Sequence, residues 1–180
     1  MHICPIDDGE PVFRPMVPCD VTVVLNSARA LQRAAASGGS QALLQGKKLG
    51  LLCQTDIDAA KKGDTGSDTQ SNADAAAFRR AASELGAHVA DVRPSLTEAS
   101  TAEEVQHTAR MLGRLYDAVE CQGMAADLVR RMSVDAGVPF YDGLACCKHP
   151  TARLAELLDG DASISDKRRF VLQAVLMNTV

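Results

Sequence analysis

A histidine at a predicted strand–loop–helix junction is the side chain with the clearest capacity for chemistry. Val138 to Tyr141 is a short apolar run closed by Asp142-Gly143, which is typical of a buried strand that ends in a turn. His149-Pro150 then begins a helix, because proline fits the first helical turn, where its missing N–H is not needed. Ligands of α/β proteins bind at such junctions, so His149 is a candidate catalytic residue; the alternative is a hydrogen-bonded structural histidine.

Two adjacent cysteines precede this histidine. Cys146, Cys147 and His149 carry ligand atoms that suit a soft metal. Adjacent side chains in an extended loop diverge, however, whereas zinc needs four convergent ligands, and the six cysteines of the chain include no Cys-x-x-Cys pair. We therefore expect no metal and no other cofactor. Cys53 and Cys121 fall in apolar runs, where cysteine behaves as a small buried hydrophobe.

A second candidate site lies at Ser71 and Asn72, at the start of a predicted helix that runs through Leu85. Either side chain can cap this helix, and the free backbone N–H groups of a helix start can also bind an anion. Asp74 suits the positive end of the helix but repels an anionic ligand. The preceding residues, 54–70, are rich in aspartate and glycine without the spacing of a calcium loop, so they predict a flexible loop.

Strand and helix patterns alternate around these candidates. Compact apolar runs predict strands over Leu49–Cys53, His88–Val92, Asp117–Cys121 and Val138–Tyr141. Periodic apolar residues with caps and glycine stops predict helices over Val23–Ala36, Ser71–Leu85, from the Thr101–Glu104 capping box, over Ala125–Ala136, from Pro150, and over Ser165–Val180. The alternation predicts an α/β fold of three layers, αβα, with a four-stranded parallel sheet.

Length and composition restrict the function. The chain has 180 residues, 46% of them hydrophobic, which predicts one domain over 23–180 after an irregular, proline-rich arm over 1–22. The net charge of -4 provides no basic surface for nucleic acid. No run reaches the roughly 18 apolar residues of a membrane span, and the first residues lack the pattern of a signal peptide. We therefore expect a cytoplasmic protein without nucleic-acid or membrane partners.

The motifs resemble those of one family, the ornithine and aspartate carbamoyltransferases. Their Val-Pro, Asn-Gly-Leu, His-Pro-x-Gln and Ala-Asp-Leu-Leu signatures are similar to Val138-Pro139, Asp142-Gly143-Leu144, His149-Pro150-Thr151-Ala152 and Ala155-Glu156-Leu157-Leu158. The resemblance extends upstream without a gap through Asp117-Ala118-Val119, Thr108-Ala109-Arg110 and Leu85-Gly86-Ala87-His88. It implies the carbamoyl-phosphate-binding domain of these enzymes, and a homo-oligomer that in this family is a trimer.

The resemblance also implies that a domain is missing. Between Leu158 and Ser165 only a few residues stand where the family has its second domain, which binds the amino-acid substrate. Ser165–Val180 is similar to the family's C-terminal helix. A complete carbamoyltransferase chain and a small anion are the partners that the resemblance implies.

Most of the residues with which the family binds carbamoyl phosphate are replaced. Ser71-Asn72-Ala73-Asp74-Ala75 stands where the resemblance implies Ser-x-Arg-Thr-Arg, Gln122 where it implies a further arginine, and Ala152 where it implies glutamine. The candidate site is therefore Ser71, Asn72, Gln122 and His149. A charge-assisted contact contributes about 1.5 to 3 kcal/mol, so the loss of three arginines weakens phosphate binding by roughly 4 to 9 kcal/mol if the terms add.

Two hypotheses of function follow. The first is a degenerate carbamoyltransferase domain that is inactive alone and acts as a scaffold or as a regulatory binder of a small ligand. The second is a working carbamoyltransferase subunit, which transfers a carbamoyl group to an amino-acid amine while a partner chain supplies the missing groups. The missing arginines favour the first hypothesis.

Overall fold

The computed structural model describes residues 20–39, 42–53 and 65–180. Residues 1–19 of the predicted N-terminal arm and 54–64 of the predicted loop over 54–70 lie outside this part of the chain. Val21 and Thr22, which were predicted to belong to the arm, instead begin the first helix, because Asp20 caps it. In chain order the elements are α1 (Val21–Ala36), β1 (Lys48–Cys53), α2 (Thr65–Glu84), β2 (His88–Val92), α3 (Ala102–Leu115), β3 (Ala118–Gln122), α4 (Ala126–Ala136), β4 (Phe140–Asp142), the 3-10 helix η2 (Pro150–Leu157) and α5 (Ile164–Thr179).

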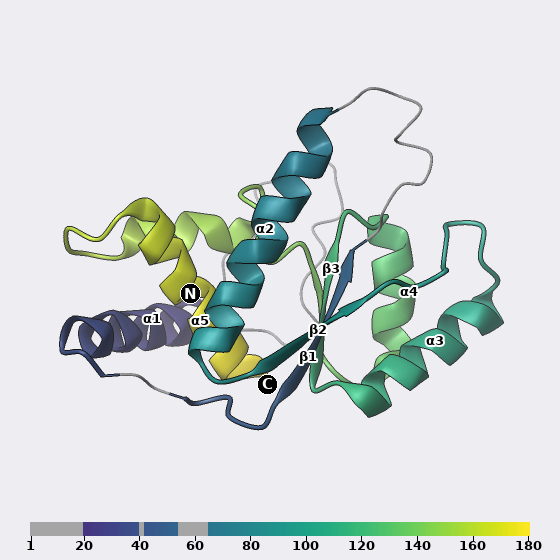
Figure 1. Ribbon diagram of the computed structural model, residues 1–180, viewed down its shortest axis with the longest axis horizontal. Coiled ribbons are helices and arrows are strands. Elements are labelled where there is room, and N and C mark those ends of the chain that lie inside the picture. The colour runs from purple at the N-terminus through teal and green to yellow at the C-terminus, as the bar shows by residue number, and fades with distance from the viewer. Residues whose placement is uncertain (1–19, 40–41, 54–64) are drawn as a thin grey trace.

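The strands form one parallel sheet in the order β2-β1-β3-β4 (Figure 1). Leu52 near the end of β1 pairs with Val92 and with Cys121, and Cys121 pairs with Asp142. The carboxyl ends of all four strands therefore meet at one edge of the sheet, where parallel α/β proteins bind ligands. The predicted four-stranded parallel sheet is confirmed.

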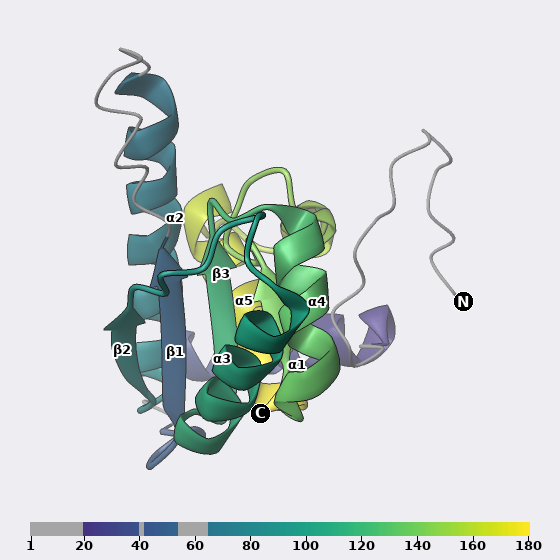
Figure 2. The same ribbon diagram turned by 90° about the vertical axis from the view of Figure 1, so that its right-hand side faces the viewer.

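Helices cover both faces of the sheet, as Figures 1 and 2 show. On one face α2 and α5 pack against Leu49 and Leu51, and α1 and η2 pack against α5. On the other face α3 and α4 enclose a separate apolar cluster with Leu52, Val119 and Phe140. This arrangement confirms the three layers predicted from the alternation of apolar runs.

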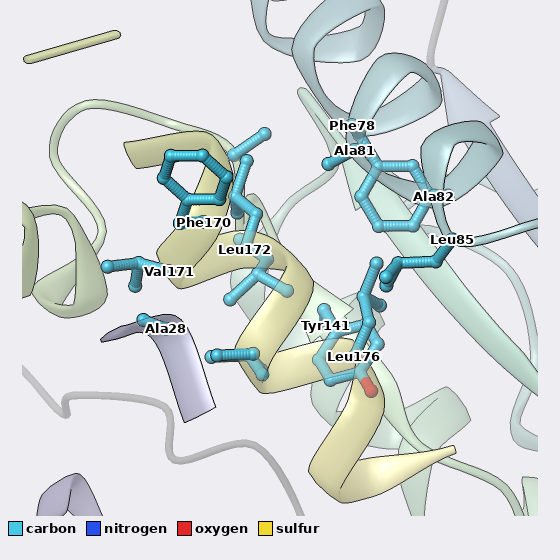
Figure 3. Close-up of a cluster of buried hydrophobic side chains, with 14 of the residues drawn as sticks. Ala28, Phe78, Ala81, Ala82, Leu85, Tyr141, Phe170, Val171, Leu172 and Leu176 are labelled. Carbon is cyan, nitrogen blue, oxygen red and sulfur yellow. The ribbon is translucent and has the colours of Figure 1, made fainter. Parts of the chain in front are cut away.

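Helix α5 lies at the centre of the larger cluster. Every residue from Phe170 to Leu176 is buried. Figure 3 shows α5 between the side chains of Phe78 of α2 and Leu85, just after α2, on one side and Ala28 of α1 on the other, with Tyr141 of the sheet close by. A helix that is apolar on all sides must be buried, so the broad apolar surface predicted for this segment serves the core. None of the described helices is long and apolar enough to cross a membrane.

Three elements differ from their prediction. Helix α2 begins at Thr65, so the predicted cap at Ser71 or Asn72 is wrong, as is the predicted loop over 65–70. The helix extends further because each residue added to an existing helix adds a hydrogen bond at little cost. The Gln70 amide at the end of the added segment also donates to the Asp74 carboxylate at 2.8 Å. The segment after His149 is a 3-10 helix, which suits a piece of eight residues.

Strand β4 begins at Phe140 because Pro139 has no N–H for the ladder, although its carbonyl accepts from Val119 N at 2.9 Å.

The pair α3 and α4 is positioned by local signals. Thr101 caps α3 and exchanges hydrogen bonds with Glu104, so the predicted capping box is confirmed. Gly137 ends α4 with φ of 70°, a left-handed conformation that favours glycine. Gly113 in the middle of α3 faces the Ala136 carbonyl oxygen so closely that a Cβ would overlap it. The two helices pack closely because position 113 has no side chain.

Candidate functional site

The carboxyl edge of the sheet brings part of the predicted site together. Strand β3 ends at Gln122, which is buried, and Gly123 turns the chain with φ of 70°. The Ser71 hydroxyl oxygen of α2 lies 3.8 Å from the point where a Cβ of Gly123 would stand. Ser71 and Gln122, which are distant in the sequence, therefore lie at the same end of β3.

The buried acid Glu120 lies next to Gln122 in the same strand. Glu120 in β3 is 0% exposed; its Oε1 accepts from the Gln122 amide, and Oε2 has no hydrogen-bond partner in the described part of the chain. Burial raises the pKa of Glu120 well above its ordinary value, an effect that the backbone N–H groups of Ala145 and Leu144 offset only in part. Gln122 is thus engaged with a neighbouring acid where the resemblance implies a cationic arginine.

Two further acidic groups lie at this edge, Asp142 at the end of β4 and Asp74 of α2. Burial raises the pKa of Asp142, and the Asp142 carboxylate in turn raises the pKa of Glu120. Asp74 of α2 is 6% exposed, and burial together with Asp74 raises the pKa of the Cys146 thiol. The edge is therefore rich in carboxyl groups and keeps its thiol protonated.

His149 lies at the far end of this loop and caps η2. Its Nδ1 accepts from Thr151 N at 3.3 Å and lies 2.8 Å from the Thr151 hydroxyl oxygen. Burial lowers the pKa of His149 to about 4, so the imidazole is neutral at pH 7. Within the described residues no hydrogen bond joins His149 to Ser71, Asn72 or Gln122. The structure gives this histidine a capping role and supplies no positive charge for an anion.

The α2 residues of the predicted site occupy unlike environments. Ser71 is half-buried in the second turn of α2, Asn72 is exposed, and Ala75 is buried in the core. The backbone N–H of Ser71 therefore belongs to the helix interior, so the anion site expected at a helix start is absent from this position. Because Ala75 is buried, the arginine that the resemblance implies at this position would have to fit into a packed apolar cluster.

Taken together, the edge suits a neutral, hydrogen-bonding ligand more than a phosphate. The edge carries the carboxyl groups of Asp74, Glu120 and Asp142 and the Gln122 amide, and His149 is neutral, so these residues offer no positive charge to an anion. No group of three or more His, Cys, Asp or Glu side chains in the described ranges could hold a metal ion.

Glu120 was not predicted as a site residue. Its signal is present in the sequence: an acid stands inside the apolar run over 117–121. Charged residues are almost never fully buried unless they have a partner, so such an acid marks a polar contact.

Comparisons with known proteins agree with this fold. Residues 69–159 match the family model of the aspartate/ornithine carbamoyltransferase carbamoyl-P binding domain. The ornithine carbamoyltransferase of Actinobacillus pleuropneumoniae serotype 5b is 34% identical over 139 residues, which are 77% of this chain and 37% of that protein. The catabolic ornithine carbamoyltransferase of Chromobacterium violaceum is 35% identical over 142 residues, 78% of this chain and 38% of that protein.

Solved structures share the fold. The ornithine carbamoyltransferase from Pyrococcus furiosus superposes with a TM-score of 0.56 at 22% identity, covering 76% of this chain and 39% of that one. The aspartate transcarbamoylase from Trypanosoma cruzi superposes with a TM-score of 0.52 at 20% identity, covering 77% of this chain and 39% of that one. The chain thus spans only 37% to 39% of the length of these four relatives. The match over 69–159 shows that the chain belongs to the aspartate/ornithine carbamoyltransferase family, within its carbamoyl-phosphate-binding domain.

Proposed function

We propose that this chain is a non-catalytic member of its family, a carbamoyl-phosphate-binding-like domain that acts as a scaffold or as a binder of a neutral small ligand. The observation that carries the proposal is the chemistry at the carboxyl edge of the sheet. Gln122 bonds to the buried Glu120, and alanines stand at 73 and 75, so the candidate site of Ser71, Asn72, Gln122 and His149 presents no cation. A doubly charged phosphate needs such cations.

The proposal extends to the assembly. Membership of the family supports a homotrimer, and the 19.1 kDa chain then gives an assembly of about 57 kDa, three times that mass. We place this assembly in the cytoplasm, on the grounds of composition given above. A small ligand or a complete carbamoyltransferase chain is the partner that such a scaffold would bind.

The test is a calorimetric titration of the full chain with carbamoyl phosphate at pH 7, together with an assay of carbamoyl transfer to ornithine and to aspartate. We expect no transfer and no saturable binding tighter than about 100 μM, which corresponds to about -5.5 kcal/mol. Tighter binding that is lost in His149→Ala would overturn the proposal. Binding lost instead in Arg168→Gln would belong to the separate cavity described next.

A further inference from the structure

A cavity lies between α2 and α5, next to the candidate site, with which it shares Asp74. It has a volume of about 270 Å³, and none of Ser71, Gln122 or His149 lines it. It is lined by residues of α2 and α5 and by Ala145 of the loop after β4. The α2 residues include Ala73 and Ala77, one turn apart, and their short side chains leave the space open.

Arginines dominate the charge of this cavity. Arg80, Arg168 and Arg169 line it, against one lining acid among the described residues, Asp74. Arg169 is held by ion pairs to Glu84 and Asp166, and Arg80 donates to Glu84. Their charges are therefore largely compensated.

Arg168 is the available cation. Its Nη2 donates to the Ala145 carbonyl at 2.9 Å, and no carboxylate of the described chain lies within 4.0 Å of its guanidinium. One edge of the guanidinium is thus fixed by the loop after β4, while the other donors remain for a ligand.

The start of α5 adds to this arrangement. Ile164 and Ser165, which line the cavity, are the first two residues of a 16-residue helix. The positive end of the helix dipole therefore lies beside the arginine. Ser163 already caps this helix and Asp166 lies in its first turn, so the uncompensated Arg168 guanidinium is the main positive group of the cavity. Together with the Ser165 hydroxyl group it suits an oxyanion.

The buried carboxylate of Asp74 favours oxyanions that can donate a hydrogen bond. A fully deprotonated anion would face this acid without a proton between them, which is unfavourable in a partly buried site. An anion that carries a hydroxyl or amino group can instead donate a hydrogen bond to Asp74. We propose that the cavity binds a small oxyanion with its own hydrogen-bond donor, such as hydrogen phosphate or a hydroxycarboxylate, and that Arg168 is its principal cation. This cavity is lined by none of Ser71, Asn72, Gln122 or His149, so the failure of one proposal leaves the other open to its own test.

The experiment is a titration of the full chain at pH 7 and low salt, with inorganic phosphate and separately with sulfate, followed by backbone amide NMR shifts. We expect saturable shifts centred on Ser165 to Arg169 and Ala145, and tighter binding of phosphate than of sulfate. Arg168→Gln should weaken phosphate binding about tenfold or more, the effect of one charge-assisted contact. Ala77→Leu, which fills the cavity without changing charge, should weaken it similarly.

Matched controls separate these effects from general ones. Lys167→Gln removes the same charge from the neighbouring position of α5, and Ala76→Leu adds the same bulk to an exposed position of α2; neither residue lines the cavity. Both controls should keep phosphate affinity within about twofold. No saturation by about 10 mM phosphate would overturn the proposal. So would sulfate binding as tight as that of phosphate, equal loss in the controls, or shifts centred on Gln122 and His149.

Discussion

At the scale of single residues, Glu120 is the group with the most unusual surroundings. The folded protein keeps a proton on this buried carboxyl group at pH values where the unfolded chain, with an ordinary pKa of 4.5, has lost it. Folding then binds a proton, so the contribution of Glu120 to stability is undiminished at low pH. That contribution decreases as pH rises above 4.5 towards the raised pKa of the folded state.

The substitution Glu120→Gln tests this behaviour. Glutamine keeps the shape of the side chain without a charge, and Gln122 can turn its amide to pair with it. We expect the free energy of unfolding of the variant, relative to that of the parent, to increase by at least about 1 kcal/mol between pH 5 and pH 8. Urea unfolding at both pH values measures the change. Glu98→Gln, at an exposed position, is the control; a constant difference for Glu120→Gln would contradict the expected linkage.

The sequence predicted positions for the candidate site but not the surroundings of those positions. Resemblance placed Gln122 and His149, and the short apolar runs placed the strands that end near them. Whether Glu120 is buried depends on packing by α2 and by the loop after β4, which local sequence patterns do not contain. The start of α2 was missed for a similar reason: the polar residues over 65–70 suit a loop as well as a helix.

At the scale of elements, the close approach of α3 and α4 depends on Gly113. In Gly113→Ala the new methyl group meets backbone atoms of Ala136, which cannot move as a flexible side chain could. We expect a loss of about 1 to 3 kcal/mol of stability, despite the better helix propensity of alanine. Thermal and urea unfolding measure this loss. Met111→Ala, on the same helix and 45% exposed, should change stability by only about 0.5 kcal/mol, and a similar result for Gly113→Ala would contradict close packing.

Helix α5 provides the second prediction at this scale. Leu176 is 0% exposed in the cluster that α5 forms with α1 and α2. Leu176→Ala should reduce the free energy of unfolding by about 2 to 5 kcal/mol, because it removes buried methyl groups and leaves a cavity. Leu157→Ala makes the same chemical change at a residue that is 54% exposed and should have little effect. Equal effects in the two variants would show that α5 is not part of the core.

The sequence signals for α3 and α4 are local, whereas the form of η2 has no local signal. The capping box at Thr101 and the stop at Gly137 depend on neighbouring residues, and both were predicted. The 3-10 form of η2 depends on how the chain returns to α5, which no local pattern specifies.

At the scale of the whole molecule, alternation of strands and helices predicts a parallel sheet because the connections are too long for hairpins. It leaves open the strand order β2-β1-β3-β4, which depends on the side to which each crossover turns.

The proposed trimer is a prediction at this scale. Light scattering on the eluate of a size-exclusion column should give about 57 kDa, three times the chain mass of 19.1 kDa, and this mass should persist on dilution. A single species at the mass of one chain would contradict the assembly while leaving the fold unaffected.

The position of α5 in the chain has a consequence for biosynthesis. A ribosome completes all four strands and α2 before it makes the helix that covers Leu49, Leu51 and Phe78. At about 5 to 20 residues per second, the segment after β4 takes a few seconds to synthesise. During that time the nascent chain presents an apolar surface to chaperones and to neighbouring nascent chains.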